Sequence, residues 1–170
     1  ERNAIKEAVK YLADPKVGAV TGVIMPITTR GDKLNDIEYA YRSYHNILRI
    51  AESKKYSTPI FHGTLTAVKA ELLKRIGGIP MWTGADDSPL ASVIAFIGYR
   101  AIALPEVILY EHAPQSIIAK MRRKIRRAQH LIQHFSQTEK KVRHLSKHLN
   151  NDFKIIYAIE KYLHIINPLI

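Results

Sequence analysis

The chain has 170 residues, of which 46% are hydrophobic, and this is enough apolar sequence to bury one sizeable core. It contains no cysteine, which excludes disulfides and thiolate metal sites. The net charge is +11, and the segment 115–150 carries ten Lys or Arg and one acid, so it holds nine of these charges. Such a segment indicates contact with phosphates of a nucleic acid or an anionic membrane, or a merely solvated helix face.

The first half of the chain begins with a helical pattern. Apolar residues at helical spacing predict a helix from Ala4 to Leu12, ended by Asp14-Pro15. Residues 17–24 form an apolar, β-branched run without alternation, which predicts a strand covered on both faces. A loop is expected at 28–33. Residues 35–50 then predict a helix with one apolar side, made of Ile37, Tyr41, Tyr44, Ile47 and Leu48.

Strand and helix patterns continue to alternate up to residue 110. Residues 61–68 predict a strand interrupted by Gly63, and 69–76 a short helix ended by Gly77-Gly78. A loop over 82–87 precedes a helix that starts at Ser88-Pro89. Two short strands, 100–104 and 107–110, follow. This succession predicts an α/β fold.

From Ser116 onward the pattern changes to a long, basic, amphipathic helical segment. Its apolar stripe suits contact with lipid or with the rest of the protein, and its basic face suits an anionic membrane surface. The stretch 153–170 is apolar but carries three charged residues, so it is too short and too charged to span a bilayer. We expect an interfacial helix there, leading toward a transmembrane region, in a chain that is part of a longer one.

Few residues stand out as candidates for chemistry. Asp86 and Asp87 are adjacent carboxylates in a loop at the start of a predicted helix, whose N-terminus favours ionised carboxylates. Such a carboxylate can take a proton from a sugar hydroxyl, although helix capping by one Asp is the simpler explanation. His112 follows Glu111 and is a candidate metal ligand or an exposed loop histidine. Gly63 allows a ligand to approach the backbone closely, or marks a strand bulge.

Taken together, these motifs resemble the second half of family 2 glycosyltransferases, which have a GT-A (Rossmann-like) fold and include the cellulose and hyaluronan synthases. The resemblance covers roughly residues 1–135 and depends on order and spacing. The segments that carry it are 11–22, 63–69, 72–78, Asp86-Asp87 and Gly98-Tyr99-Arg100. It implies an acceptor-side half of a GT-A catalytic domain at 1–114, a basic amphipathic segment at 115–150 and an apolar interfacial helix at 151–170.

The resemblance also implies roles for single residues. Asp87 matches the catalytic base that deprotonates the acceptor hydroxyl, and Asp86 replaces the glutamate of the family's Glu-Asp pair. Processive members carry Gln-x-x-Arg-Trp, where this chain has Arg123-Lys124-Ile125-Arg126-Arg127, so the Gln and the Trp are replaced. The residues expected to bind substrate are Gly63, Thr64, Arg123, Arg126 and Arg127, and His112 falls at a position where related enzymes bind a metal.

The predicted function is therefore that of an inverting hexosyltransferase at the cytoplasmic face of a membrane. It would use a nucleotide-sugar donor, a glycan or lipid acceptor, and a divalent cation, Mg²⁺ or Mn²⁺. The family binds this cation mainly through an Asp-x-Asp motif, which these residues lack, so we expect the motif upstream and no activity from the chain alone. The alternatives are a nucleic-acid-binding module, disfavoured because the basic segment lacks interleaved aromatics, and a membrane-surface module without catalysis.

Overall fold

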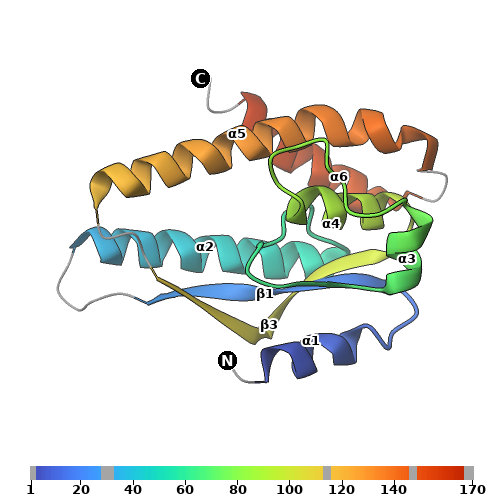
Figure 1. Ribbon diagram of the computed structural model, residues 1–170, viewed down its shortest axis with the longest axis horizontal. Helices are drawn as coiled ribbons and strands as arrows, with labels where there is room; N and C mark the ends of the chain where they lie inside the picture. The colour runs from blue at the N-terminus through green and yellow to red at the C-terminus, as the bar shows by residue number, and fades with distance from the viewer. Residues whose placement is uncertain (1–2, 28–32, 113–115, 146–148, 167–170) are drawn as a thin grey trace.

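The computed structural model describes residues 3–27, 33–112, 116–145 and 149–166. At its centre lies a mixed three-stranded sheet with the order β2-β1-β3. β3 (Arg100–His112) runs parallel to β1 (Val17–Ile27), and the short β2 (Thr66–Val68) runs antiparallel to it. Helix α1 (Ala4–Tyr11) lies on one side of the sheet, and the other helices lie on the opposite side (Figure 1). The α/β prediction is confirmed.

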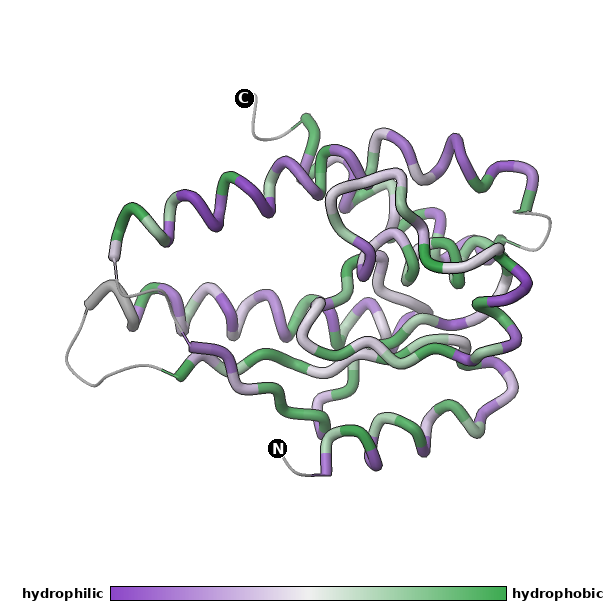
Figure 2. Tube along the Cα trace, in the orientation of Figure 1, coloured by the Kyte–Doolittle hydropathy of each residue, from purple (hydrophilic) through white to green (hydrophobic). Residues whose placement is uncertain are grey.

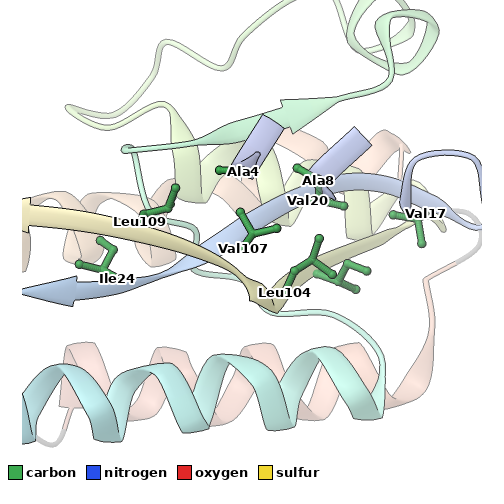
Figure 3. Close-up of a cluster of buried hydrophobic side chains, with 9 residues drawn as sticks. Ala4, Ala8, Val17, Val20, Ile24, Leu104, Val107 and Leu109 are labelled. Atoms are coloured by element: carbon green, nitrogen blue, oxygen red, sulfur yellow. The ribbon is translucent and has the colours of Figure 1, made fainter. Parts of the chain in front are cut away.

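The prediction that β1 is covered on both faces is also correct, because every residue from Val17 to Ile24 is buried. One face packs against α1 in a cluster drawn in Figure 3, which consists of Ala4, Ala8, Val17, Val20, Ile24, Ile102, Leu104, Val107 and Leu109. On α1, however, Ile5 and Val9 are exposed. Only part of the predicted stripe of α1 therefore belongs to the core.

The two short strands predicted after Gly98 form one strand with an irregularity. Gly22 of β1 pairs with Leu104, and the next residue, Val23, pairs with Ile108, so the intervening residues of β3 bulge out of the ladder. A Cβ atom at Gly22 would lie 2.2 Å from the carbonyl oxygen of Val107. Glycine is required there because the backbone of the bulged strand approaches too closely for any side chain.

Helix α2 (Lys33–Lys55) turns most of its apolar side away from the core. That side is largely exposed, at Ile37, Tyr41, Tyr44 and Ile47, whose exposed fractions lie between 43% and 68%. The buried side is polar instead and contains Glu38, Arg42, Asn46, Arg49, Glu52 and Ser53.

The physical reason is that α2 covers strand backbone. The side-chain amide of Asn46 bonds both the N–H and the C=O of Ile24, at 3.3 and 2.8 Å, and the hydroxyl of Ser53 accepts the N–H of Ala103 at 2.8 Å. Buried peptide groups need such partners, and the contact also covers the outer edge of β3.

The segment before α4 is more loop than predicted. The strand expected over 61–68 is limited to β2, and residues 61–65 form a loop. Helix α3 (Ala70–Arg75) ends as expected at Gly77 and Gly78, which have φ values of +83° and +104°. The N–H of Gly78 bonds the carbonyl of Leu73 at 2.9 Å, as in a Schellman motif.

The C-terminal helices pack back onto the sheet domain. Helix α4 (Asp87–Phe96) lies between the sheet and a pair formed by α5 (Ile117–Val142) and α6 (Asn151–Lys161), with η1 (Arg143–Leu145) following α5 and a π-helical turn, η2 (Tyr162–Ile166), following α6. The helices share a buried cluster of Val93, Ala95, Phe96, Phe135, Val142, Phe153 and Tyr157. The predicted division at 114 and 150 stays a prediction, although all three parts contribute to adjoining cores.

Helix α5 alternates between polar and apolar residues along its whole length (Figure 2). Its N-cap is Ser116, whose hydroxyl accepts the N–H of Ala119 at 3.1 Å. Only its C-terminal half is buried on one side, at His134, Phe135, Thr138 and Val142. In the described part of the chain, no helix has both the length and the apolar character needed to cross a bilayer.

Candidate active site

A cavity of about 540 Å³ opens where the loop before β2, the start of α4, and helices α2 and α5 meet. Most of the residues expected from the sequence line it, namely Gly63, Thr64, Asp86, Asp87, Arg126 and Arg127. A second hollow of about 640 Å³, between α1, β3 and the end of α2, contains none of them. The first cavity is therefore the candidate site.

Asp87 is the first residue of α4, and its half-buried carboxylate lines the cavity. One carboxylate oxygen, Oδ1, accepts the backbone N–H of Ser88 at 2.7 Å. The other oxygen, Oδ2, would lie 3.3 Å from a Cβ atom at Gly63, so the carboxylate and the glycine backbone face each other closely. Burial raises the pKa of Asp87, the charge of Asp86 adds to this, and the hydrogen bond from Ser88 opposes it.

Asp86 differs from Asp87 although the two are adjacent. Its side chain is exposed, and it occupies the N-cap position of α4 without forming a side-chain capping hydrogen bond. Helix capping, the simpler explanation from the sequence, therefore does not account for the Asp86 carboxylate. The pair thus presents one half-buried and one solvated carboxylate to the same cavity.

The loop that carries Gly63 is tied to two neighbouring elements. The hydroxyl of Thr21, from β1, donates to the carbonyl of Leu65 at 2.7 Å, and the hydroxyl of Ser88, from α4, donates to the carbonyl of Phe61 at 3.5 Å. Because Ser88 also bonds Asp87, the start of α4 and the glycine loop are fixed relative to each other. This is how chain segments more than twenty residues apart meet at the site.

A cluster of arginines around one glutamate lines another side of the cavity, and we call it the arginine wall. The carboxylate of Glu111, near the end of β3, pairs with Arg127 at 3.5 Å, with Arg42 at 3.6 Å, and with Arg123. Burial, followed by repulsion from neighbouring arginines, lowers the pKa of both Arg123 and Arg127 to about 10. Both stay cationic at neutral pH, so the wall keeps a surplus of positive charge. Arg126 is exposed and lines the cavity, whereas Arg123 pairs with Glu111 and does not line it.

The predicted metal ligand, His112, is not brought together with carboxylates. It is exposed at the end of β3, opposite Ile27 of β1. Among the residues that the structure describes, no group of three His, Asp or Glu side chains is arranged to hold a metal ion. These residues therefore do not form a metal site by themselves.

Several cavity residues were not anticipated from the sequence, among them Arg42, His45 and His62. Burial, followed by the charge of Arg49, lowers the pKa of His45 to about 4, and burial with Arg42 lowers that of His62 to about 3. Both imidazoles are thus neutral at pH 7, and neutral imidazoles can hydrogen-bond hydroxyl groups. A polar stripe at helical spacing on α2, parallel to its apolar stripe, was the available signal for Arg42 and His45.

The mixed α/β fold matches part of a known glycosyltransferase. That protein is mannosyltransferase PcManGT from Pyrobaculum calidifontis, whose structure is a complex with GDP-Man and Mn²⁺. The two sequences are 45% identical, the TM-score is 0.78, and the match covers 99% of this chain and 43% of the mannosyltransferase chain. The chain thus spans less than half the length of this relative. No protein-family model matches the chain, and the search of curated proteins gives no match.

Proposed function

We propose that this chain forms the acceptor side of an inverting, family 2 (GT-A) glycosyltransferase that uses a nucleotide-sugar donor. The likeness to a mannosyltransferase over nearly the whole chain supports transfer of a hexose, with GDP-mannose as the first donor to test. The observation that carries the proposal is the Asp87 carboxylate, which lines a sugar-sized cavity directly opposite the backbone of Gly63.

Asp87 acts as the general base in this proposal. The acceptor hydroxyl would be bound between the glycine loop, at Gly63 and Thr64, and the start of α4. Asp87 Oδ2 takes its proton while the oxygen attacks the anomeric carbon. One base and one displacement on the face opposite the leaving group give inversion. Asp86 lies at the cavity rim and adds negative charge, which strengthens Asp87 as a proton acceptor.

The arginine wall binds the leaving nucleoside diphosphate. Arg126 and Arg127 line the cavity, and a guanidinium can bind phosphate oxygens in a bidentate manner. Glu111 holds Arg127 and Arg123 in place through ion pairs, which reduces the entropy that these long side chains lose on binding. In this chain the Gln and the Trp of the processive motif are replaced. We therefore favour transfer of a single sugar over processive polymer synthesis.

We also propose that the enzyme requires a divalent cation, because the similar mannosyltransferase was solved with Mn²⁺. Such a cation would neutralise charge on the leaving diphosphate. The described residues include no group that fits it, so no role is assigned to His112 and no step is derived through the metal. Its expected ligands are those of an Asp-x-Asp motif outside this sequence.

The proposed location is the cytoplasmic membrane surface, with a glycan or lipid acceptor. Support comes from α5, whose N-terminal half exposes an apolar stripe of Ile117, Ile118, Met121 and Ile125 beside exposed basic side chains. Exposed apolar patches with a positive rim are typical of proteins that bind anionic lipid surfaces.

The test is Asp87→Asn in the full-length enzyme, supplied with GDP-mannose, Mn²⁺ and a panel of glycan and lipid acceptors. We expect transfer to fall by at least about 1,000-fold, because the amide cannot accept the proton at the reacting oxygen. Binding of GDP, measured by calorimetry, should stay within about twofold, since Asp87 does not contact the arginine wall. A variant with near-normal turnover contradicts the assignment of the base.

A further inference from the structure

The loop that leads into Asp87 is attached to one face of α5. The backbone N–H of Gly84 donates to the side-chain oxygen of Gln133 at 3.0 Å. Two residues earlier, the indole N–H of Trp82 donates to the hydroxyl of Thr138 at 3.3 Å. Within the loop, the hydroxyl of Thr83 accepts the N–H of Ala85 at 3.2 Å, which stiffens the turn. The loop is thus bonded to α5 at two points, three and five residues before Asp87.

The loop also touches α5 too closely for a side chain at position 84. A Cβ atom at Gly84 would lie 2.6 Å from Nε2 and 2.7 Å from Cδ2 of the His130 ring. Gly84 has no positive φ to explain the glycine, so close contact with α5 is its structural reason.

Helix α5 is itself fixed against α4. His134 is fully buried, and its ring nitrogens lie 3.2 Å from the hydroxyl of Ser92 on α4 and 2.9 Å from that of Thr138. Burial lowers the pKa of this histidine to about 3, so the ring is neutral and the link does not depend on its charge. The loop is therefore held on one side by α5, which is itself fixed, and the C-terminal end of the loop continues into α4.

The same helix carries the two arginines of the wall, Arg126 and Arg127, that line the cavity from α5. Arg126 and Arg127 lie about two turns before Gln133 on α5, because seven residues make two helical turns. The position of the loop relative to the arginines is consequently set within one helix.

We propose that Gln133 is a positioning residue for Asp87: through Gly84 it holds the loop against α5 and keeps the carboxylate in place between the glycine loop and the arginine wall. The catalytic consequence rests on the proposed function, whereas the attachment of the loop does not. A displacement of the order of 1 Å at a reacting group can cost ~100-fold in rate, so a modest hydrogen bond far from the reacting atoms has a large effect on kcat.

The experiment compares Gln133→Leu with Gln129→Leu, the same substitution at an exposed position one turn earlier on α5. Trp82 is the single tryptophan of the sequence, so its fluorescence in this chain reports the loop directly. For Gln133→Leu we expect about twofold greater quenching of Trp82 by acrylamide, because the loop loses one of its two hydrogen bonds to α5. Gln129→Leu should match the wild type. Gln133→Glu should also match it, because its carboxylate still accepts the Gly84 N–H.

In the full-length enzyme, Gln133→Leu should lower kcat about tenfold or more, with the donor KM changed less than about twofold. Gln133→Glu should recover most of kcat. Gly84→Ala, whose methyl group meets His130, should reproduce both signatures and provides a second variant if Gln133→Leu fails to fold.

Equal quenching and equal kcat in Gln133→Leu and Gln129→Leu would overturn the proposal. A loss expressed only in KM would also overturn it, because Gln133 would then bind substrate rather than position the base. If the wild-type enzyme transfers no sugar, the proposed function fails, and the Trp82 comparison still decides whether Gln133 holds the loop.

Discussion

At the scale of single residues, the candidate site depends on the contrast between two adjacent carboxylates. Asp87 is half-buried beside Gly63, and Asp86 is exposed at the rim. Burial alone makes the first a better proton acceptor, because it disfavours the charged form and so raises the pKa. A base that must be ionised to work then loses activity in acid at a higher pH than an ordinary aspartate, whose pKa is about 3.9.

This gives a prediction for the pH dependence of kcat/KM, which reports groups of the free enzyme. The acid limb should have an apparent pKa above about 3.9. Asp86→Asn should move that limb to lower pH, because the charge of Asp86 contributes to the raised pKa of Asp87. The test measures steady-state rates of the wild type and of Asp86→Asn from pH 4 upward, in steps of roughly half a pH unit. An unchanged limb, or one moved to higher pH, contradicts Asp87 as the titrating base.

At the scale of elements, α5 combines two roles along its length. Its C-terminal half is packed against α4 and α6, whereas its N-terminal half exposes the apolar stripe beside exposed lysines and arginines. The amphipathic pattern was evident in the sequence. The sequence did not show which half of the stripe is buried, because that depends on which part of α5 the helices α4 and α6 cover.

The exposed half predicts binding to anionic vesicles. Replacing Ile118 and Ile125 by Ser should greatly reduce flotation with vesicles of phosphatidylcholine and phosphatidylserine, since full burial of such side chains contributes roughly 1.5–3 kcal/mol each. The matched control replaces Ile5 and Val9, equally exposed residues of α1 on the other side of the sheet. Equal flotation of both variants would contradict the assignment of the membrane-facing surface. Pure phosphatidylcholine should bind less, because each basic residue near an anionic surface contributes about 1 kcal/mol.

At the scale of the whole molecule, α2 and α6 are joined by a buried charged cluster. The guanidinium of Arg49 lies 2.6 Å from the carboxylate of Glu160, which is 111 residues later in the sequence. The same guanidinium lies 3.3 Å from the carboxylate of Glu52. Burial, with the neighbouring charge of Glu160, raises the pKa of Glu52 to about 8, although Arg49 opposes this. For Glu160, burial acts in the same direction, but Arg49 and the hydrogen bonds hold its pKa below the usual value.

The cluster therefore contains one protonated and one ionised carboxyl at pH 7, against one arginine. A carboxyl whose folded pKa is raised binds a proton in the native state that the unfolded chain has released, so stability falls as pH rises toward about 8. Below about pH 6.5 the buried histidines, which are neutral in the native state, make stability rise with pH instead. The decline due to Glu52 is thus visible between about pH 7 and 8.

We predict that the free energy of unfolding falls across this window by at most about 1.4 kcal/mol per pH unit, the value for one proton. Glu52→Gln, which keeps a hydrogen-bond donor without a titrating group, should flatten the decline. Urea titrations at several pH values measure it, and Glu139→Gln, at an exposed glutamate, serves as the control. The same slope in Glu52→Gln and wild type would show that this carboxyl is already ionised.

The sequence by itself determined the local features. β1 follows from its apolar run, the end of α3 from Gly77-Gly78, and the adjacent carboxylates from their place before a helix, because each depends on neighbours a few residues away. The tertiary structure decided what depends on distant partners. It turned the polar side of α2 inward, where the strand edge needs hydrogen-bond partners, and it placed Glu111 among three arginines from two helices. Burial and ion pairing arise between segments that only folding brings together, so no local pattern specifies them.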